Sequence, residues 1–218
     1  MHAIDFFLNI LLHIDTQLGV FFKSYGVWAY VILFFVIFCE TGLVVAPFLP
    51  GDSLLFAVGA LATKHMISLK VMIPLLILAA VAGDQTNFWI GRSIGHLLIR
   101  MKDRWYFKKA YLDRTHNFYD TYGGKTLIYA RFIPIIRTYA PFVAGLGQMA
   151  YLRFCLFSVS GGVLWIFSMI MAGYLFGNVP IIQAHFTFVV LGIVVITLLP
   201  ALITFIRMRF YQKTTAID

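Results

Sequence analysis

The apolar runs of this chain are interrupted by charged residues that lie beside prolines. Glu40 and Asp52 flank one interruption, and Arg131 and Arg137 flank another that contains Pro134. A charge inside a bilayer core costs on the order of a few kcal/mol, so it must face protein or water. Irregular backbone at that depth is restricted in the same way. We therefore expect a membrane fold that encloses a polar site.

The composition supports a protein that crosses a membrane several times. Of the 218 residues, 61% are hydrophobic and only 12% are charged. Several apolar runs approach the roughly 20 residues that cross a bilayer core. We expect one all-α transmembrane domain over residues 1–218, with no cleaved signal peptide, because no basic residue precedes the first apolar run. Cys39 and Cys155 lie far apart in apolar surroundings and are expected to be free thiols.

Positive charge is concentrated in two parts of the chain. Residues 92–125 carry eight lysines and arginines against three aspartates, and the C-terminal tail adds Arg207, Arg209 and Lys213. Nucleic acid is a poor partner for so apolar a chain. The positive-inside rule explains the bias better and predicts that both regions are cytoplasmic, beside anionic lipid headgroups.

Three segments are expected to cross the membrane, namely 71–91, 153–176 and 187–206. With residues 92–125 and the tail on one side, the segment 126–150 must add an even number of crossings. It is too short for two full crossings, and it holds two arginines and two prolines. A re-entrant hairpin that enters from the cytoplasm satisfies these conditions.

Residues 27–63 are expected to form a second re-entrant hairpin, which enters from the opposite side. One apolar limb ends at Glu40 and another follows Asp52, although two short crossings are an alternative. The tripeptide Ala46-Pro47-Phe48 recurs as Ala140-Pro141-Phe142. Two oppositely oriented hairpins would make an inverted repeat, an arrangement that places a binding site near the membrane midplane.

The remaining segments are expected to support this core. Residues 4–23 form an interfacial or polar-faced helix, and whether it crosses is open. Residues 104–122 mix aromatic and basic side chains, which is typical of an amphipathic helix on the cytoplasmic surface. The pairs Gly91-x-x-x-Gly95 and Gly173-x-x-x-Gly177 permit close contact between helices.

Arg131 and Arg137 are the candidates for binding an anion. A guanidinium binds phosphate or carboxylate through two parallel hydrogen bonds and keeps its proton. Pro134 prevents the two arginines from sharing one regular helix face, but a hairpin tip can aim both at one point. The alternatives are side chains that extend to the lipid headgroups and a structural salt bridge.

Glu40 and Asp52 are the candidates for proton coupling. Burial favours the neutral form of a carboxylate and a nearby arginine favours the charged form, so a change of partner can move a proton. A static ion pair is the alternative for Glu40. For Asp52 the alternative is a helix N-cap, because Pro50-Gly51-Asp52-Ser53 precedes an apolar run.

Asp84, Asn87 and Arg92 are three accessory candidates. Asp84 is expected to bond to Asn87 or to tyrosine side chains, or else to extend the charged site; Arg92 is expected to anchor the inner membrane face. Ser158 and Ser160 are interpreted as helix-packing residues. The histidines lack metal-ligand spacing, and no nucleophile elbow or phosphate-binding glycine loop is present in the sequence. We therefore expect neither an enzyme nor a bound metal or cofactor.

Several motifs together resemble the DedA family of bacterial inner-membrane proteins, over about residues 10–210. They are Phe38-Cys-Glu-Thr-Gly-Leu43, Phe48-Leu-Pro-Gly-Asp-Ser-Leu-Leu55, Gly83-Asp-x-x-Asn87 with Ile90-Gly-Arg92, and Ala130-Arg-Phe-Ile-Pro-x-x-Arg137 with Ala140-Pro-Phe-Val-Ala-Gly145.

This resemblance implies membrane-potential-dependent lipid transport in the bacterial inner membrane. Members of the family are implicated in returning undecaprenyl phosphate across that membrane, and related eukaryotic proteins resemble lipid scramblases. An acidic pair and an arginine pair that are essential in the family match Glu40, Asp52, Arg131 and Arg137 here.

The leading hypothesis is a proton-coupled translocase for a lipid phosphate such as undecaprenyl phosphate. The arginines hold the headgroup, the carboxylates exchange protons, and the tail stays among membrane phospholipids. The rival hypotheses are a proton/cation or drug antiporter, an energy-independent phospholipid scramblase, and a non-transporting assembly factor. The exact lipid, the direction, the coupling ion and the oligomeric state stay open.

Overall fold

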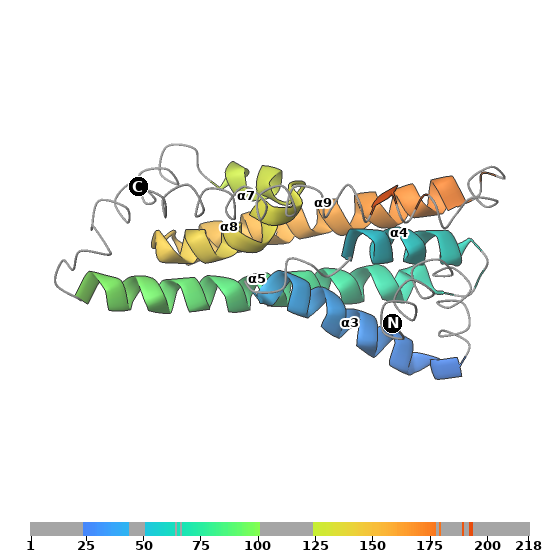
Figure 1. Ribbon diagram of the computed structural model, residues 1–218, viewed down its shortest axis with the longest axis horizontal. Coiled ribbons are helices and arrows are strands. Elements are labelled where there is room, and N and C mark those ends of the chain that lie inside the picture. Colours follow the sequence, from blue (N-terminus) through green and yellow to red (C-terminus); the bar gives the residue numbers. More distant parts are fainter. Residues whose placement is uncertain are drawn as a thin grey trace, which may run out of the picture.

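The computed structural model describes residues 24–43, 51–63, 65, 67–100, 124–177, 179, 189, 192 and 193. The regular structure of these residues is helical throughout, as expected. The expected helices at 4–23 and 104–122, nearly all of 187–206, and the motif at 46–48 lie outside the described residues. In chain order the helices of Figure 1 are α3 (Val27–Gly42), α4 (Gly51–Ala62), α5 (Leu69–Arg100), α7 (Lys125–Ala130), α8 (Pro134–Leu146) and α9 (Tyr151–Gly177).

Two long helices, α5 and α9, run along the molecule in opposite directions (Figure 1). Each is apolar and long enough to cross a membrane, over Leu69–Leu97 and Tyr151–Gly177. The sequence placed the end of the first crossing at Gly91, but α5 continues to Arg100. The residues after Gly91 contain no proline and keep an apolar pattern, so nothing stops the helix there.

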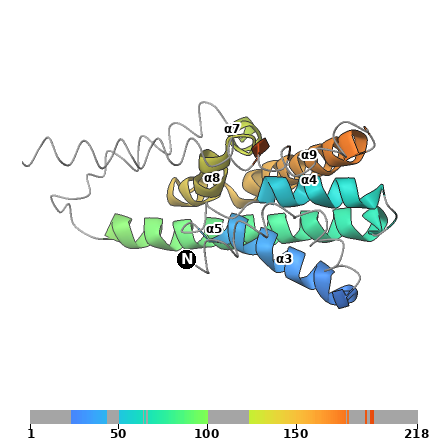
Figure 2. The same cartoon turned by 45° about the vertical axis from the view of Figure 1, so that its right-hand side comes forward.

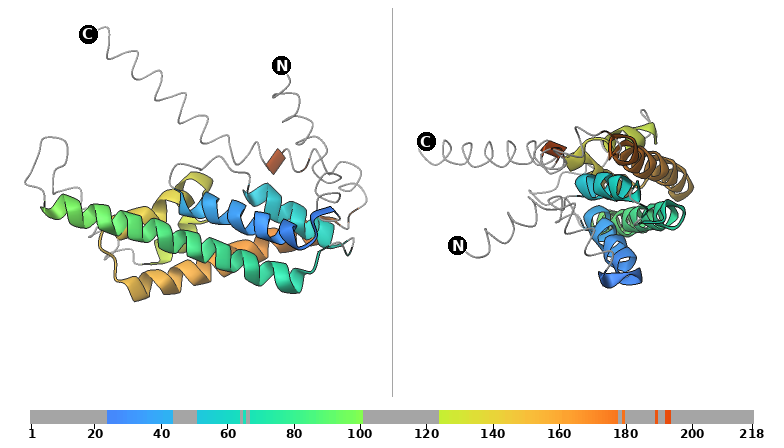
Figure 3. Two further views of the ribbon diagram at one scale, coloured as in Figure 1. Left: turned by 90° about the horizontal axis from the view of Figure 1, so that it is seen from below. Right: turned by 90° about the vertical axis from the view of Figure 1, so that its right-hand side faces the viewer.

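The shorter helices cover the two halves of this pair. Helices α3 and α4 lie beside the start of α5 and the end of α9, whereas α8 lies beside the end of α5 (Figures 1 and 2). Helices α4 and α8 both begin near the middle of the long axis and run toward opposite ends (Figures 1 and 2, and the left view of Figure 3). The first turns of α4 and α8 therefore point toward the centre of the molecule.

Glycines let α4 approach α9 closely. A Cβ atom at Gly173 would overlap the carbonyl oxygen of Phe56, and one at Gly59 would overlap the carbonyl oxygen of Ile170. A Cβ at Gly177 would lie 2.9 Å from the Cβ of Ala60. The two helices thus meet backbone to backbone, as expected for small residues spaced four apart.

The contact between α5 and α8 has the same form. A Cβ at Gly91 would overlap the carbonyl oxygen of Phe142, and one at Gly145 would overlap that of Phe88. At Gly95 a Cβ would lie 2.8 Å from the carbonyl oxygen of Leu146. The close contacts expected from both Gly-x-x-x-Gly pairs are confirmed.

The apolar residues separate into a packed interior and an exposed coat. Met72, Leu76 and Ile166 are fully buried between the helices, and the rings of Phe88 and Phe154 stack with centroids 4.2 Å apart. Large apolar side chains also cover the outer faces of α3, α5 and α9; they include Val27, Trp28, Leu78, Leu97, Leu152 and Leu156, each 59–78% exposed. An apolar coat of this extent suits a lipid surrounding. Cys39 and Cys155 are both free, as predicted.

Replacing Gly173 with valine is expected to destabilise the fold. The new side chain has to displace the backbone of Phe56, and overpacking a tight interface costs about 1–3 kcal/mol. The check is thermal unfolding of the detergent-solubilised protein, followed by the loss of its monodisperse gel-filtration peak. Gly192→Ala is the control, because a Cβ there meets open space. Equal unfolding temperatures for the two variants would contradict the tight packing of α4 on α9.

Candidate functional site: a buried charge network

Five charged side chains are buried in the described part of the protein. Glu40 lies near the end of α3, Asp52 in the first turn of α4 and Asp84 midway along α5. Arg131 directly follows α7, and Arg137 lies in the first turn of α8. None of the five is more than 7% exposed. Side chains that extended to the headgroups would be far more exposed, so that alternative is wrong for both arginines.

Arg137 binds the carboxylates of both Glu40 and Asp52. Its Nη1 donates a hydrogen bond to Asp52 Oδ1 at 2.5 Å, and its Nη2 donates to Glu40 Oε1. The guanidinium also lies over the ring of Trp165, 4.7 Å from its centroid, and the indole Nε1 donates to Asp52 Oδ1 at 2.9 Å. The guanidinium of Arg137 therefore links α8 to both α3 and α4, and it lies against Trp165 of α9.

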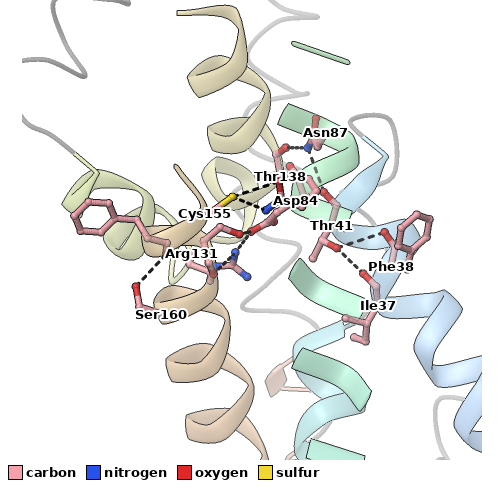
Figure 4. Close-up of polar contacts among 12 residues, drawn as sticks. Ile37, Phe38, Thr41, Asp84, Asn87, Arg131, Thr138, Cys155 and Ser160 are labelled. Carbon is pink, nitrogen blue, oxygen red and sulfur yellow. Dashed lines mark hydrogen bonds and ion pairs between the residues drawn. The ribbon is translucent and has the colours of Figure 1, made fainter. Parts of the chain in front are cut away.

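Arg131 has a different partner. Its Nη2 donates to Asp84 Oδ2 and to the carbonyl oxygen of Ser158, the latter at 3.3 Å. Ser158 Oγ donates to the same Asp84 oxygen at 2.6 Å. Figure 4 shows Asp84 and Arg131 facing one another between α5 and the start of α9. Of the two expectations for Asp84, a bond to Asn87 or tyrosine is replaced by the other, since its pairing with Arg131 extends the charged site.

Asn87 on α5 is hydrogen-bonded to the backbone of both α3 and α8, close to Glu40 and Arg137. Its Nδ2 donates to the carbonyl oxygens of Thr41, at 3.1 Å, and Thr138, at 2.6 Å. Figure 4 shows it between these residues. Because Thr41 follows Glu40 and Thr138 follows Arg137 in the chain, Asn87 positions the acid and the base of one ion pair.

Arg92 connects α5 to the residues between α8 and α9. Its Nη1 donates to the carbonyl oxygen of Met149 at 3.2 Å, and its guanidinium lies 5.8 Å from the ring centroids of both Phe88 and Trp89. It therefore ties α5 to the short connection between α8 and α9.

The structure brings the predicted residues together but pairs them differently. Both acids from α3 and α4 were expected to compete for both arginines, whereas they bind Arg137, and Arg131 is bound by Asp84. The N-cap alternative for Asp52 is also corrected, since Asp52 is the second residue of α4 and its Oδ1 accepts bonds from other helices. Two residues were missed: Trp165 was not singled out, and Ser158 was assigned to packing alone.

The two arginines line one small pocket. Asp84 and Ser158 complete its polar wall, and apolar side chains from α7, α8 and α9 form the remainder. When all five groups are ionised, the three carboxylates outnumber the guanidiniums by one. The two guanidiniums beside this pocket present the planar N–H donors that bind oxyanions, and Asp84 is the carboxylate that lines the pocket with them.

A bundle with two long apolar helices and a charge network at its centre suits a membrane protein built around a polar site. The model of the VTT domain family matches residues 49–175, which include four of the five buried charges. The chain therefore belongs to this family, also called the DedA family.

The relatives agree with the family match. The chain is 48% identical over 209 residues to Protein DedA of Escherichia coli (strain K12), covering 95% of each protein. It is 43% identical over 174 residues to an uncharacterized membrane protein of Mycobacterium tuberculosis, covering 79% of this chain and 76% of the relative. The inner membrane protein YqjA of Escherichia coli (strain K12) is 36% identical over 154 residues, which cover 70% of this chain and 69% of the relative. No solved structure matches the chain.

Proposed function

We propose that this protein is a proton-motive-force-dependent translocase for lipid phosphates, with undecaprenyl phosphate as its substrate in the bacterial inner membrane. The observation that carries the proposal is the burial of Arg131 and Arg137 beside one pocket, each held by a carboxylate from another helix. Arginine forks fit the oxygens of a phosphate, and buried carboxylates can carry the coupled protons. An antiporter has no need for two guanidiniums in the same pocket.

In this proposal, α3–α4 and α7–α8 are two re-entrant hairpins of an inverted repeat. The support is the equivalent packing of their second limbs. Phe56, Gly59 and Ala60 of α4 meet a Gly-x-x-x-Gly pair on α9, and α8 meets one on α5 through residues of the same spacing, namely Phe142, Gly145 and Leu146. The α7–α8 hairpin enters from the cytoplasm, on the side of the basic residues 92–125 and the C-terminus.

The first turns of α4 and α8 add to the attraction for an anion. Backbone N–H groups at a helix N-terminus carry partial positive charge, and both of these helices begin at the centre of the molecule. A phosphate headgroup that reaches this position replaces the carboxylates of Glu40 and Asp52 as the hydrogen-bond acceptor of Arg137. A carboxylate released into so apolar a site is stabilised by binding a proton, which couples headgroup movement to proton movement.

The polyprenyl tail does not enter the charge network. The outer faces of α5 and α9 are covered with exposed apolar side chains that suit contact with lipid tails. Only the headgroup then needs a polar path, and it reaches the pocket from the side while the tail stays among phospholipids.

The test is transport by the purified protein in vesicles that contain a labelled polyprenyl phosphate. Headgroups exposed on the outer leaflet are measured with a water-soluble phosphatase, with and without an imposed pH gradient. We expect exposure to be faster than in protein-free vesicles and to respond to the gradient. Protein-dependent exposure that ignores the gradient would indicate a scramblase. Gradient-driven cation flux in vesicles without the lipid, and no headgroup exposure, would indicate an antiporter.

A further inference from the structure

The glycine contacts divide the described helices into two units. Helices α3 and α8 pack on α5; besides the α8 contact, a Cβ at Gly42 would lie 3.1 Å from the Cα of Gly83. Helices α4 and α7 pack on α9; a Cβ at Gly124 would overlap the ring of Phe157. We call α3, α5 and α8 the α5 unit, and α4, α7 and α9 the α9 unit. The α3–α5, α8–α5 and α4–α9 contacts are backbone to backbone, so these helices approach one another closely.

Two ion pairs cross the boundary between these units, in opposite senses. Arg137 of the α5 unit binds Asp52 of the α9 unit, at 2.5 Å. Arg131, at the end of α7 in the α9 unit, binds Asp84 of the α5 unit. Ser158 of the α9 unit strengthens the second pair by donating to Asp84. In each of these two pairs, the arginine belongs to one unit and the carboxylate to the other. Among the three buried acids, only Glu40 binds an arginine of its own unit, Arg137.

Arg131 and Arg137 line the same small pocket, so one ligand there can bind both guanidiniums. Because that pocket already holds the Asp84 carboxylate, a phosphate cannot simply join the network and must displace its acids. The network has capacity for a new acceptor, since Arg137 Nε is buried and donates to no partner among the described residues. Two guanidiniums match the two negative charges of a phosphate monoester, whereas a phosphodiester supplies only one.

We infer that the anion site is divided between the two units, and that Asp84 is a third exchangeable carboxylate, which holds Arg131 until a phosphate monoester displaces it. This inference rests on the proposed function and deepens it. When the headgroup binds both arginines, the carboxylates of Glu40, Asp52 and Asp84 are all released, and each takes up one proton from the solution to form an O–H bond. Both cross-unit ion pairs are then broken, and the units are joined at the site through the phosphate alone.

The test compares proton uptake by wild-type and Asp84→Asn protein in detergent, in a weakly buffered solution with a pH indicator. The probe is a short prenyl phosphate, and its methyl ester serves as the diester. We expect Asp84→Asn to bind the prenyl phosphate at least as tightly as wild type and to take up one proton fewer per bound molecule. Thr86→Ala, an exposed change on the same helix, is the control and should match wild type.

The outcomes separate this inference from the proposed function. If wild-type protein does not bind the prenyl phosphate, the proposed function fails. If wild type binds it, but Asp84→Asn takes up the same number of protons, or if the diester binds as tightly as the monoester, the divided site fails and the proposed function stands.

A second variant covers the case in which Asp84→Asn does not fold. Ser158→Ala removes one hydrogen bond from Asp84 and leaves its charge in place. Asp84 then leaves Arg131 more easily, so we expect a few-fold tighter binding of the prenyl phosphate with unchanged proton uptake. Lower thermal stability without tighter binding would show that Asp84 and Ser158 serve the fold alone, and would overturn the inference.

Discussion

Arg137→Ala protein is expected to move lipid phosphate no faster than protein-free vesicles. The substitution removes the cation that binds both Glu40 and Asp52, and it leaves two buried carboxylates facing one another. Breaking a buried ion pair in this way costs about 3–5 kcal/mol. The variant should therefore also unfold at a lower temperature, and the transport measurement needs equal amounts of folded, reconstituted protein.

Arg137→Lys separates the loss of stability from the loss of function. Lysine keeps the positive charge but presents no planar fork, so it cannot reproduce both hydrogen bonds. One hydrogen bond to a charged group contributes about 1.5–3 kcal/mol, which corresponds to a roughly tenfold to hundredfold reduction in headgroup affinity. Arg153→Ala, an exposed arginine at the start of α9, is the matched control and should transport normally. Wild-type rates from folded Arg137→Ala protein would remove this arginine from the mechanism.

Glu40→Gln is expected to weaken the response of transport to an imposed pH gradient, because one of the exchangeable carboxylates is lost. Glutamine has the shape of glutamate and still accepts a hydrogen bond from Arg137, but it cannot exchange a proton. Glu40 is fully buried, and its Oε2 packs against the backbone of Gly51, where even a Cβ atom would overlap it. A substitution of the same size is therefore the appropriate one.

The measurement is headgroup exposure over a range of pH, at equal protein content. Wild-type rates should vary with pH and with the gradient, and Glu40→Gln rates should vary less with both. Cys39→Ser, at the half-buried neighbouring position, is the control and should behave as wild type. Gradient-driven transport by Glu40→Gln at the wild-type rate would assign proton coupling to another group.

The sequence predicted the main charged residues of the site but not the way they pair. Glu40, Asp52, Arg131 and Arg137 stand out because a charge in an apolar run is too costly to occur without a partner. Which acid meets which arginine depends on contacts between helices distant in the chain, and no local pattern encodes these. Asp84 was consequently ranked as an accessory, although it is the partner of Arg131.

Trp165 and Ser158 were missed as network members for a related reason. Each lies in a long apolar helix, where a tryptophan or a serine is an ordinary packing residue. The one local signal is the small-residue stretch from Ser158 to Gly162, and the side chain of Arg131 fills the space beside its two glycines. Helix α5 extends past its predicted end because charge and glycine near Arg92 do not stop a helix, and Gly95 still packs on the end of α8.

A structure of the detergent-solubilised protein with a bound short-chain prenyl phosphate tests the central claim most directly. The account predicts a phosphate in contact with both Arg131 and Arg137, and a broken bond between Arg137 and Asp52. A phosphate bound at the surface, with all three buried ion pairs intact, would contradict it.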